Sequence, residues 1–161
     1  MSEREIVELR IPDTGYSWRR WLGNLCAWPR YGMHAVWRAE AKRWAAKIAD
    51  KHPRRVVLHG RSRGAVVALY TAIYLLEHDR HMEIELDLTA SLRAFTSRKW
   101  ERHYLPYLMQ CEIQATRAYG DPFGYLPPCW RHIRVERVVG PPVWLKPAAH
   151  LPSYIELYNN E

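Results

Sequence analysis

The sequence contains few cysteines, and their arrangement predicts neither a disulfide nor a metal site. Its three cysteines are odd in number and form no C-x-x-C pair, which favours free thiols in packing positions: Cys26, Cys111 and Cys129. The eight histidines are scattered, and neither an H-E-x-x-H motif nor a paired Cys/His ligand spacing occurs. We therefore expect no metal ion and no disulfide framework.

Long hydrophobic runs are also missing. No segment approaches the roughly 18 uninterrupted apolar residues of a membrane span, and Met1 to Glu5 lack the apolar stretch of a signal peptide. We expect a cytoplasmic protein, although export by an uncleaved or non-standard route stays open. The chain shows no internal repeat, low-complexity segment or linker, and its 161 residues predict one domain, 1–161.

Acidic residues are outnumbered, and the net charge is +7 with a pI near 9.5. Such a surface attracts polyanions, which include nucleic acid, anionic lipid headgroups and acidic substrates. Several of the eight tryptophans lie beside arginine, as in Trp18-Arg19-Arg20-Trp21. These pairs suit lipid anchors, base-stacking platforms or ordinary core aromatics, and the last interpretation is favoured.

Apolar periodicity predicts strands and helices in alternation along the chain. The period-two run from Met82 to Leu88 indicates a strand with one wet face, near the edge of the sheet. Strands and helices that alternate along one length of chain predict an α/β domain with a mostly parallel sheet. The expected strands are 6–11, 54–59, 82–88, 112–119, 133–139 and 143–145, and the expected helices are 34–50, 65–77, 100–109 (irregular, interrupted at Pro106) and 151–158.

The most informative motif is Gly60-Arg61-Ser62-Arg63-Gly64, a G-x-S-x-G pentapeptide between a predicted strand and a predicted helix. In this context the motif is typical of the nucleophile elbow of serine hydrolases. The serine would sit on a sharp turn, where the two glycines let strand and helix approach without a Cβ between them. Ser62 is therefore the candidate nucleophile.

A serine needs a histidine to accept its proton and a carboxylate to orient that histidine. Asp121 and His150 follow Ser62 in the order Ser, Asp, His that α/β-hydrolases use. Asp121 follows a predicted strand, where ligands bind in open α/β sheets. Asp87 is the rival acid, but its place within an alternating strand indicates a solvated residue. The histidines that compete with His150 are His34, His103 and His132.

These blocks resemble, in order, the motifs of the class 3 lipases, and the resemblance covers nearly the whole chain. That family carries Asp-Trp-Leu-x-Asn-Leu, then Val-His before a long helix, then Gly-His-Ser-Leu-Gly-Gly, and later Asp-x-Val-x-x-Leu-Pro-Pro and a terminal His. The resemblance implies an α/β-hydrolase-like fold: a mostly parallel sheet flanked by helices, in a minimal lipase-like core without a large lid and with an open site. The corresponding blocks here are 9–11, 20–25, 33–34, 60–65, 91–93, 120–128 and 150–154.

The chain departs from that family around the nucleophile. Arg61 and Arg63 stand in place of the family's His and Leu. The oxyanion donors would be the backbone N–H of Arg63 and an N–H from the loop after the first strand, where Pro12 has none and Asp13 or Thr14 are the candidates.

Arginines beside the nucleophile would favour substrates with negative charge near the scissile ester. Arg61 is accordingly a candidate substrate-binding residue, and Trp21 is a second candidate. The alternative is that Arg61 and Arg63 project into solvent or bind neighbouring carboxylates.

Together these features predict a serine esterase of lipase type that needs no cofactor and acts on lipid or phospholipid acyl esters, with peripheral contact to anionic membranes. A second hypothesis is a weakened hydrolase-fold binding module, whose basic, tryptophan-rich surface holds a polyanion, an anionic membrane or a protein partner. Nucleic acid is the less favoured ligand.

Overall fold

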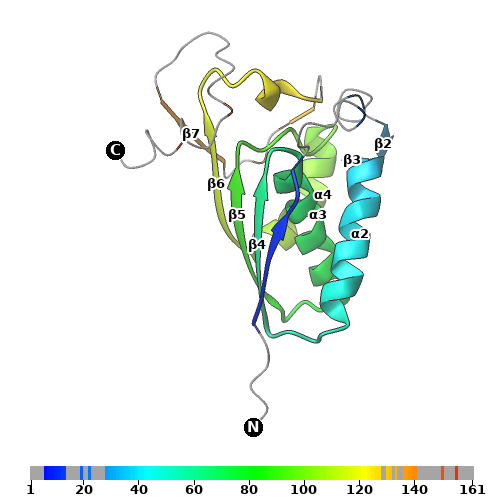
Figure 1. The fold of residues 1–161 in the computed structure, drawn as a ribbon. Coiled ribbons are helices and arrows are strands. Elements are labelled where there is room, and N and C mark those ends of the chain that lie inside the picture. Colours follow the sequence, from blue (N-terminus) through cyan, green and yellow to red (C-terminus); the bar gives the residue numbers. More distant parts are fainter. Residues whose placement is uncertain are drawn as a thin grey trace.

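The fold is built on a five-stranded sheet in which every neighbouring pair is parallel (Figure 1). The strands lie in the order β1-β4-β5-β6-β7 and span Ile6–Ile11 (β1), Arg55–Arg61 (β4), Glu83–Thr89 (β5), Glu112–Ala118 (β6) and Glu136–Val139 (β7). A parallel order of this kind requires crossover connections, which confirms the predicted α/β class. The computed structural model describes residues 6–13, 19, 22, 28–127, 130, 131, 133, 136–140, 150 and 155.

The described α-helices lie on one side of this sheet (Figure 1). They are α2 (Ala35–Ala49), α3 (Arg63–His78) and α4 (Arg98–Leu108), and α3 contacts both of the others as well as the sheet. Two short antiparallel strands, β2 (Pro29–Arg30) and β3 (Met33–His34), precede α2, and a 3-10 turn, η1 (Phe123–Tyr125), follows β6. Among the described residues, no helix is both long and apolar enough to span a bilayer.

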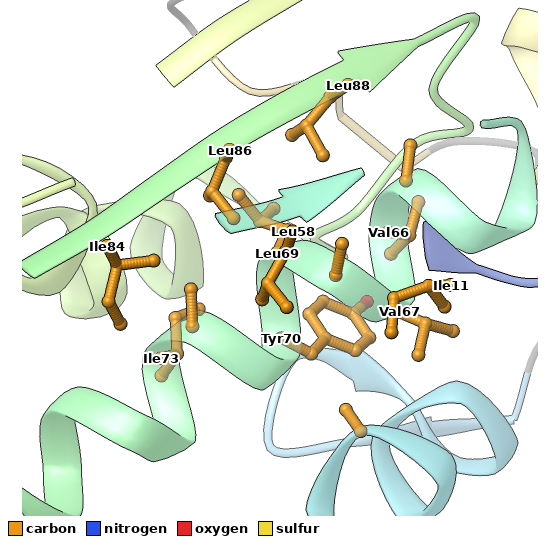
Figure 2. Packing of buried hydrophobic residues seen from close by; sticks show 14 of the residues in the cluster. Ile11, Leu58, Val66, Val67, Leu69, Tyr70, Ile73, Ile84, Leu86 and Leu88 are labelled. Carbon is orange, nitrogen blue, oxygen red and sulfur yellow. The ribbon is translucent and has the colours of Figure 1, made fainter. Parts of the chain in front are cut away.

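Helix α3 forms the centre of the hydrophobic core, because nearly every side chain from Arg63 to Leu76 is buried. Leu69 and Ile73 face the sheet, where they meet the strand residues Leu58, Leu86 and Ile84 (Figure 2). The apolar run predicted for this helix reflects contact with the sheet on one side and with α2 and α4 on the other. The core thereby fixes the N-terminus of α3 against the end of β4.

Two predictions about these elements were wrong. Strand β5 is the third of five strands and not an edge strand. Its alternation arises because the face of β5 turned away from the buried core carries Glu83, Glu85 and Asp87, whereas central parallel strands usually have both faces covered. Helix α4 runs through Pro106 without interruption. Because Pro106 lies in the last turn, its missing N–H removes one hydrogen bond near the end of the helix.

The polar face of the sheet is crossed by side-chain bridges between neighbouring strands. His59 of β4 contacts Asp87 of β5 through Nδ1 at 3.0 Å and Glu8 of β1 through Nε2 at 2.9 Å. Arg55 of β4 likewise donates to Glu85 of β5 at 2.5 Å. These pairs join three parallel strands, on the face opposite the buried strand residues that pack against α3.

The hydrogen bond to Asp87, supported by Glu8, raises the pKa of His59 above its ordinary value of 6.5. Because the folded-state pKa is raised, the stabilisation is complete below the unfolded-state pKa and is lost as the pH rises through the folded-state pKa. We expect His59→Gln to lower the free energy of unfolding more at about pH 5 than at about pH 8. The effect should be modest, since both carboxylates are more than half exposed.

Urea denaturation of the wild type and the variant at both pH values measures this difference. His81→Gln, at an exposed histidine in the loop before β5, is the matched control. An equal loss of stability by His59→Gln at both pH values would show that the bridge does not depend on the imidazolium.

Candidate active site

Ser62 occupies a sharp turn between the last residue of β4 and the first residue of α3. Its backbone has φ 53° and ψ −124°, a conformation that L-residues rarely adopt and that costs on the order of 1–3 kcal/mol. Its N–H donates to the carbonyl of Thr89 at the end of β5, at 3.0 Å. A strained strand-to-helix turn at this position is the backbone geometry that the motif predicts.

The two glycines of the motif permit this turn because there is no room for a Cβ at either position. A Cβ on Gly60 would lie 2.5 Å from the carbonyl oxygen of Gly64. A Cβ on Gly64 would lie 2.7 Å from the carbonyl oxygen of Ile11 and 2.8 Å from that of Pro12. Helix α3 therefore lies closer to the end of β4 and to the end of β1 than a side chain at either glycine would allow.

Ser62, His150 and Asp121 form a continuous hydrogen-bonded chain. The Nε2 of His150 lies 3.1 Å from the Oγ of Ser62, and the Nδ1 lies 2.7 Å from the Oδ2 of Asp121. All three residues are buried, with exposures of 3%, 7% and 0% for Ser62, His150 and Asp121. The structure thus brings the three residues proposed from the sequence into contact, although they lie far apart along the chain.

The loop after β6 holds the carboxylate of Asp121 in place. Its Oδ1 accepts the backbone N–H groups of Phe123 at 2.9 Å and Gly124 at 3.4 Å, which leaves Oδ2 for the imidazole. The ring of Phe123 packs against the imidazole, with its centroid 5.0 Å from that of His150. Both oxygens of the buried carboxylate therefore have partners, as a buried charge requires.

This arrangement fixes the tautomer of His150. An ionised carboxylate can only accept hydrogen bonds, so the Nδ1 that faces Asp121 carries a proton. In the neutral imidazole, Nε2 then presents its lone pair to the hydroxyl of Ser62. A neutral imidazole held in this way can take the proton of an attacking serine and stay stabilised as imidazolium by the carboxylate.

The rival acid and histidines lie elsewhere. Asp87 binds His59 on the polar face of the sheet. His34 is stacked on Trp37 in the core, with ring centroids 4.0 Å apart, and His103 contacts Trp100 and Tyr104 edge-on. His132 lies outside the described residues.

The described cysteine, Cys111, is a poor alternative nucleophile. It is a free thiol whose Sγ donates to the carbonyl of Tyr107 at 3.6 Å. Burial raises its pKa to about 12, so little thiolate forms at neutral pH. The described residues also contain no cluster of His, Cys, Asp and Glu that could hold a metal ion. Cys26 and Cys129 lie outside the described residues.

Both arginines of the motif bind carboxylates of the chain itself. Arg61 donates to Asp13 Oδ2 at 3.1 Å, and Arg63 forms a nearly buried ion pair with Glu40 of α2. The sequence left two interpretations of these arginines open, contact with a charged substrate and binding to neighbouring carboxylates, and the structure shows the second kind of contact. The role of Arg61 in binding substrate stays a prediction, as does that of Trp21, which lies outside the described residues.

The candidate oxyanion donors border the same turn. Arg63 is the first residue of α3, where the N–H groups have no partner within the helix. Asp13 follows β1 and Pro12 directly, and Thr14 lies outside the described residues. The sequence predicts an open, accessible site, whereas only 3% of the surface of Ser62 is exposed. The expected lack of a large lid stays a prediction.

Sequence reasoning missed two residues that support the site. Glu40 had the pattern of a solvated helix residue, yet it neutralises Arg63. The only signal for it was Arg63 itself, because an arginine beside a buried serine needs a carboxylate nearby. Phe123, which packs on His150, was noticed only as part of a motif block.

The sequence matches no protein-family model and no curated protein at a significant level. Among solved structures, the crystal structure of a mutant form of MDLA from Penicillium cyclopium is similar, with a TM-score of 0.47 and 20% sequence identity. The match covers 65% of this chain and 38% of that chain, so this protein spans well under half of its length. A likeness at this level concerns the course of the backbone alone and assigns no activity.

The glycine contacts give a direct test of the turn. We expect Gly64→Ala to cost about 1–3 kcal/mol of unfolding free energy, because the new Cβ overlaps two backbone carbonyls of β1 and its following loop. Gly124→Ala is the matched control, since its Cβ would lie 3.6 Å or more from its neighbours and should change stability by less than about 0.5 kcal/mol. Urea denaturation compares the two; equal stabilities would refute the close approach of α3 to β1.

Proposed function

We propose that this protein is a serine hydrolase that cleaves carboxylic esters through an acyl-enzyme. The observation that supports this most strongly is the chain of hydrogen bonds from Ser62 through His150 to Asp121. The strained turn at Ser62 adds a second, independent argument, since such strain is kept where function requires it. The resemblance of the sequence blocks to class 3 lipases favours the same chemistry.

In the first half of the reaction, the Oγ of Ser62 attacks the ester carbonyl carbon while Nε2 of His150 takes the hydroxyl proton. The carbonyl double bond opens to a tetrahedral oxyanion. When that intermediate collapses, the bond to the alcohol oxygen breaks, and the imidazolium gives its proton to the departing alcohol. The acyl group stays on Ser62.

In the second half, a water molecule repeats the sequence. Nε2 takes a proton from the water as its oxygen attacks the acyl carbon, and collapse of the second oxyanion returns the proton to the serine oxygen. The carboxylic acid leaves and the resting enzyme is restored. Asp121 keeps the imidazole oriented and stabilises its positive charge at each step.

The oxyanion would be stabilised by the backbone N–H of Arg63 and by one from the loop after Pro12, where Asp13 is the described candidate. The substrates that we favour are lipid or phospholipid acyl esters, met at the surface of an anionic membrane. The net charge of +7 supports attraction to such a surface.

Labelling with a fluorophosphonate probe tests the proposal. Wild-type protein should gain one adduct in intact mass, and Ser62→Ala and His150→Ala should gain none, because one lacks the nucleophile and the other its base. Asp121→Asn should label roughly 10⁴-fold more slowly, because an amide favours the wrong tautomer of His150.

Two variants serve as controls. Ser91→Ala removes another buried serine, and Asp87→Asn removes the other carboxylate that binds a histidine; both should label like the wild type. An unlabelled wild type that is well folded by circular dichroism would contradict the proposal and leave the binding module as the hypothesis to pursue. Binding to anionic vesicles that is sensitive to salt and unchanged in Ser62→Ala would then support that module.

A further inference from the structure

The two arginines beside Ser62 hold the same short loop, the residues Pro12 and Asp13 that follow β1. From the end of β4, the guanidinium of Arg61 donates through Nη1 to the carboxylate of Asp13 at 3.1 Å. Its Nη2 donates to the backbone carbonyl of His150 at 3.0 Å. One side chain therefore links the loop after β1 to the backbone of the histidine that contacts Ser62.

From the start of α3, Arg63 reaches the backbone of that loop. Its Nη2 donates to the carbonyl oxygen of Pro12 at 3.2 Å and lies 3.5 Å from that of Asp13. Its Nη1 donates to the carboxylate of Glu40 on α2. The Arg63 side chain is only 8% exposed, so Glu40 neutralises a charge that would be costly to bury alone.

These contacts set the direction of a backbone donor. In a trans peptide the C=O and N–H groups point in opposite directions, and the peptide between Pro12 and Asp13 is not among the cis bonds found in the structure. Because the Pro12 carbonyl points to Arg63, the N–H of Asp13 points away from that guanidinium. The hydrogen bond from Arg63 thus constrains the direction of the N–H of Asp13, the one described candidate donor of this loop.

We propose that Arg61 and Arg63 are positioning residues for the reaction at Ser62. Arg63 orients the Pro12–Asp13 peptide that would face the oxyanion, and Arg61 fixes the backbone of His150 to the same loop. The proposal rests on the proposed esterase function, and it replaces recognition of a charged substrate as the reason for two arginines beside the nucleophile. The Nη groups of both side chains donate to Asp13, Glu40 and backbone carbonyls of the chain itself. The buried Nε of each has no hydrogen-bond partner among the described residues.

Arg61→Met tests the proposal, with Arg55→Met as its matched control. Both arginines lie on β4 with side chains on the polar face, and each binds a carboxylate, but Arg55 binds Glu85 at the opposite end of the strand. Two readouts are compared: labelling and turnover at Ser62, and the Nδ1 proton resonance of His150, assigned by its loss in His150→Gln. This resonance can be recorded whether or not the protein catalyses any reaction.

We expect Arg61→Met to lower the rate constant for labelling by a neutral fluorophosphonate by up to about 100-fold, because a small displacement of a catalytic group is costly. The value of kcat should fall alike for a neutral ester and for one that carries a carboxylate, with little change in KM. The His150 resonance should shift or broaden. Arg55→Met should leave the rate, kcat and the resonance as in the wild type.

The outcomes separate this proposal from the function on which it rests. A wild type that labels, with Arg61→Met equal to Arg55→Met in rate and resonance, overturns the positioning role and keeps the esterase. A rise in KM confined to the charged ester overturns it in favour of substrate recognition. A wild type that does not label, but whose His150 resonance changes only in Arg61→Met, rejects the esterase and supports the positioning of His150 by Arg61.

Discussion

The backbone turn at Ser62 is the constraint on which the rest of the structure depends. Its positive φ reverses the chain between β4 and α3 within one residue, and that conformation is unfavourable on its own. It persists because Gly60 and Gly64 let strand and helix touch, and because the buried α3 cannot move away from the sheet without exposing the core. Packing far from the site thus holds the serine where His150 can reach it.

Charge distribution follows from the same arrangement. Helices α2, α3 and α4 cover one face of the sheet (Figure 1). The buried apolar residues of β4 and β5 point that way, and the charged residues of these two strands meet on the other face. Arg61 belongs to this polar face, yet it lies at the end of its strand, where the loops of the site gather. Arg63 enters the buried side and is neutralised by Glu40. The turn between them separates two environments, yet both arginines also bind the Pro12–Asp13 loop.

Much of the fold could be predicted from the sequence, because periodicity reports which face of an element is buried. Strand β1 and helix α2 lie where the apolar pattern placed them. The position of β5 could not be predicted in this way, since an alternating strand results either from an edge or from an uncovered face. The effect of Pro106 could not be predicted either, because a proline interrupts a helix in its interior but is tolerated in the last turn, where Pro106 lies.

For the candidate site too, local features could be predicted from the sequence and contacts between distant residues could not. The elbow is local, so five consecutive residues predict it, whereas the contact of Ser62 with His150 joins positions 88 residues apart. Chain order and resemblance to a family suggested that contact, but no spacing rule fixes it. The partners of Arg61 and Arg63 were not predictable, because Asp13 and Glu40 come from separate elements that only the folded sheet and helices bring near Ser62.

The central claim is that Ser62 forms an acyl-enzyme, and the most direct measurement is to trap that species. Rapid acid quenching during turnover of an activated ester, followed by peptide mass spectrometry, locates any acyl group on the chain. We expect an acyl group on the peptide that contains Ser62, which appears before the acid product accumulates and decays as the ester is exhausted. Hydrolysis by the folded protein without any acylated species, or with the acyl group only on another residue, would contradict it.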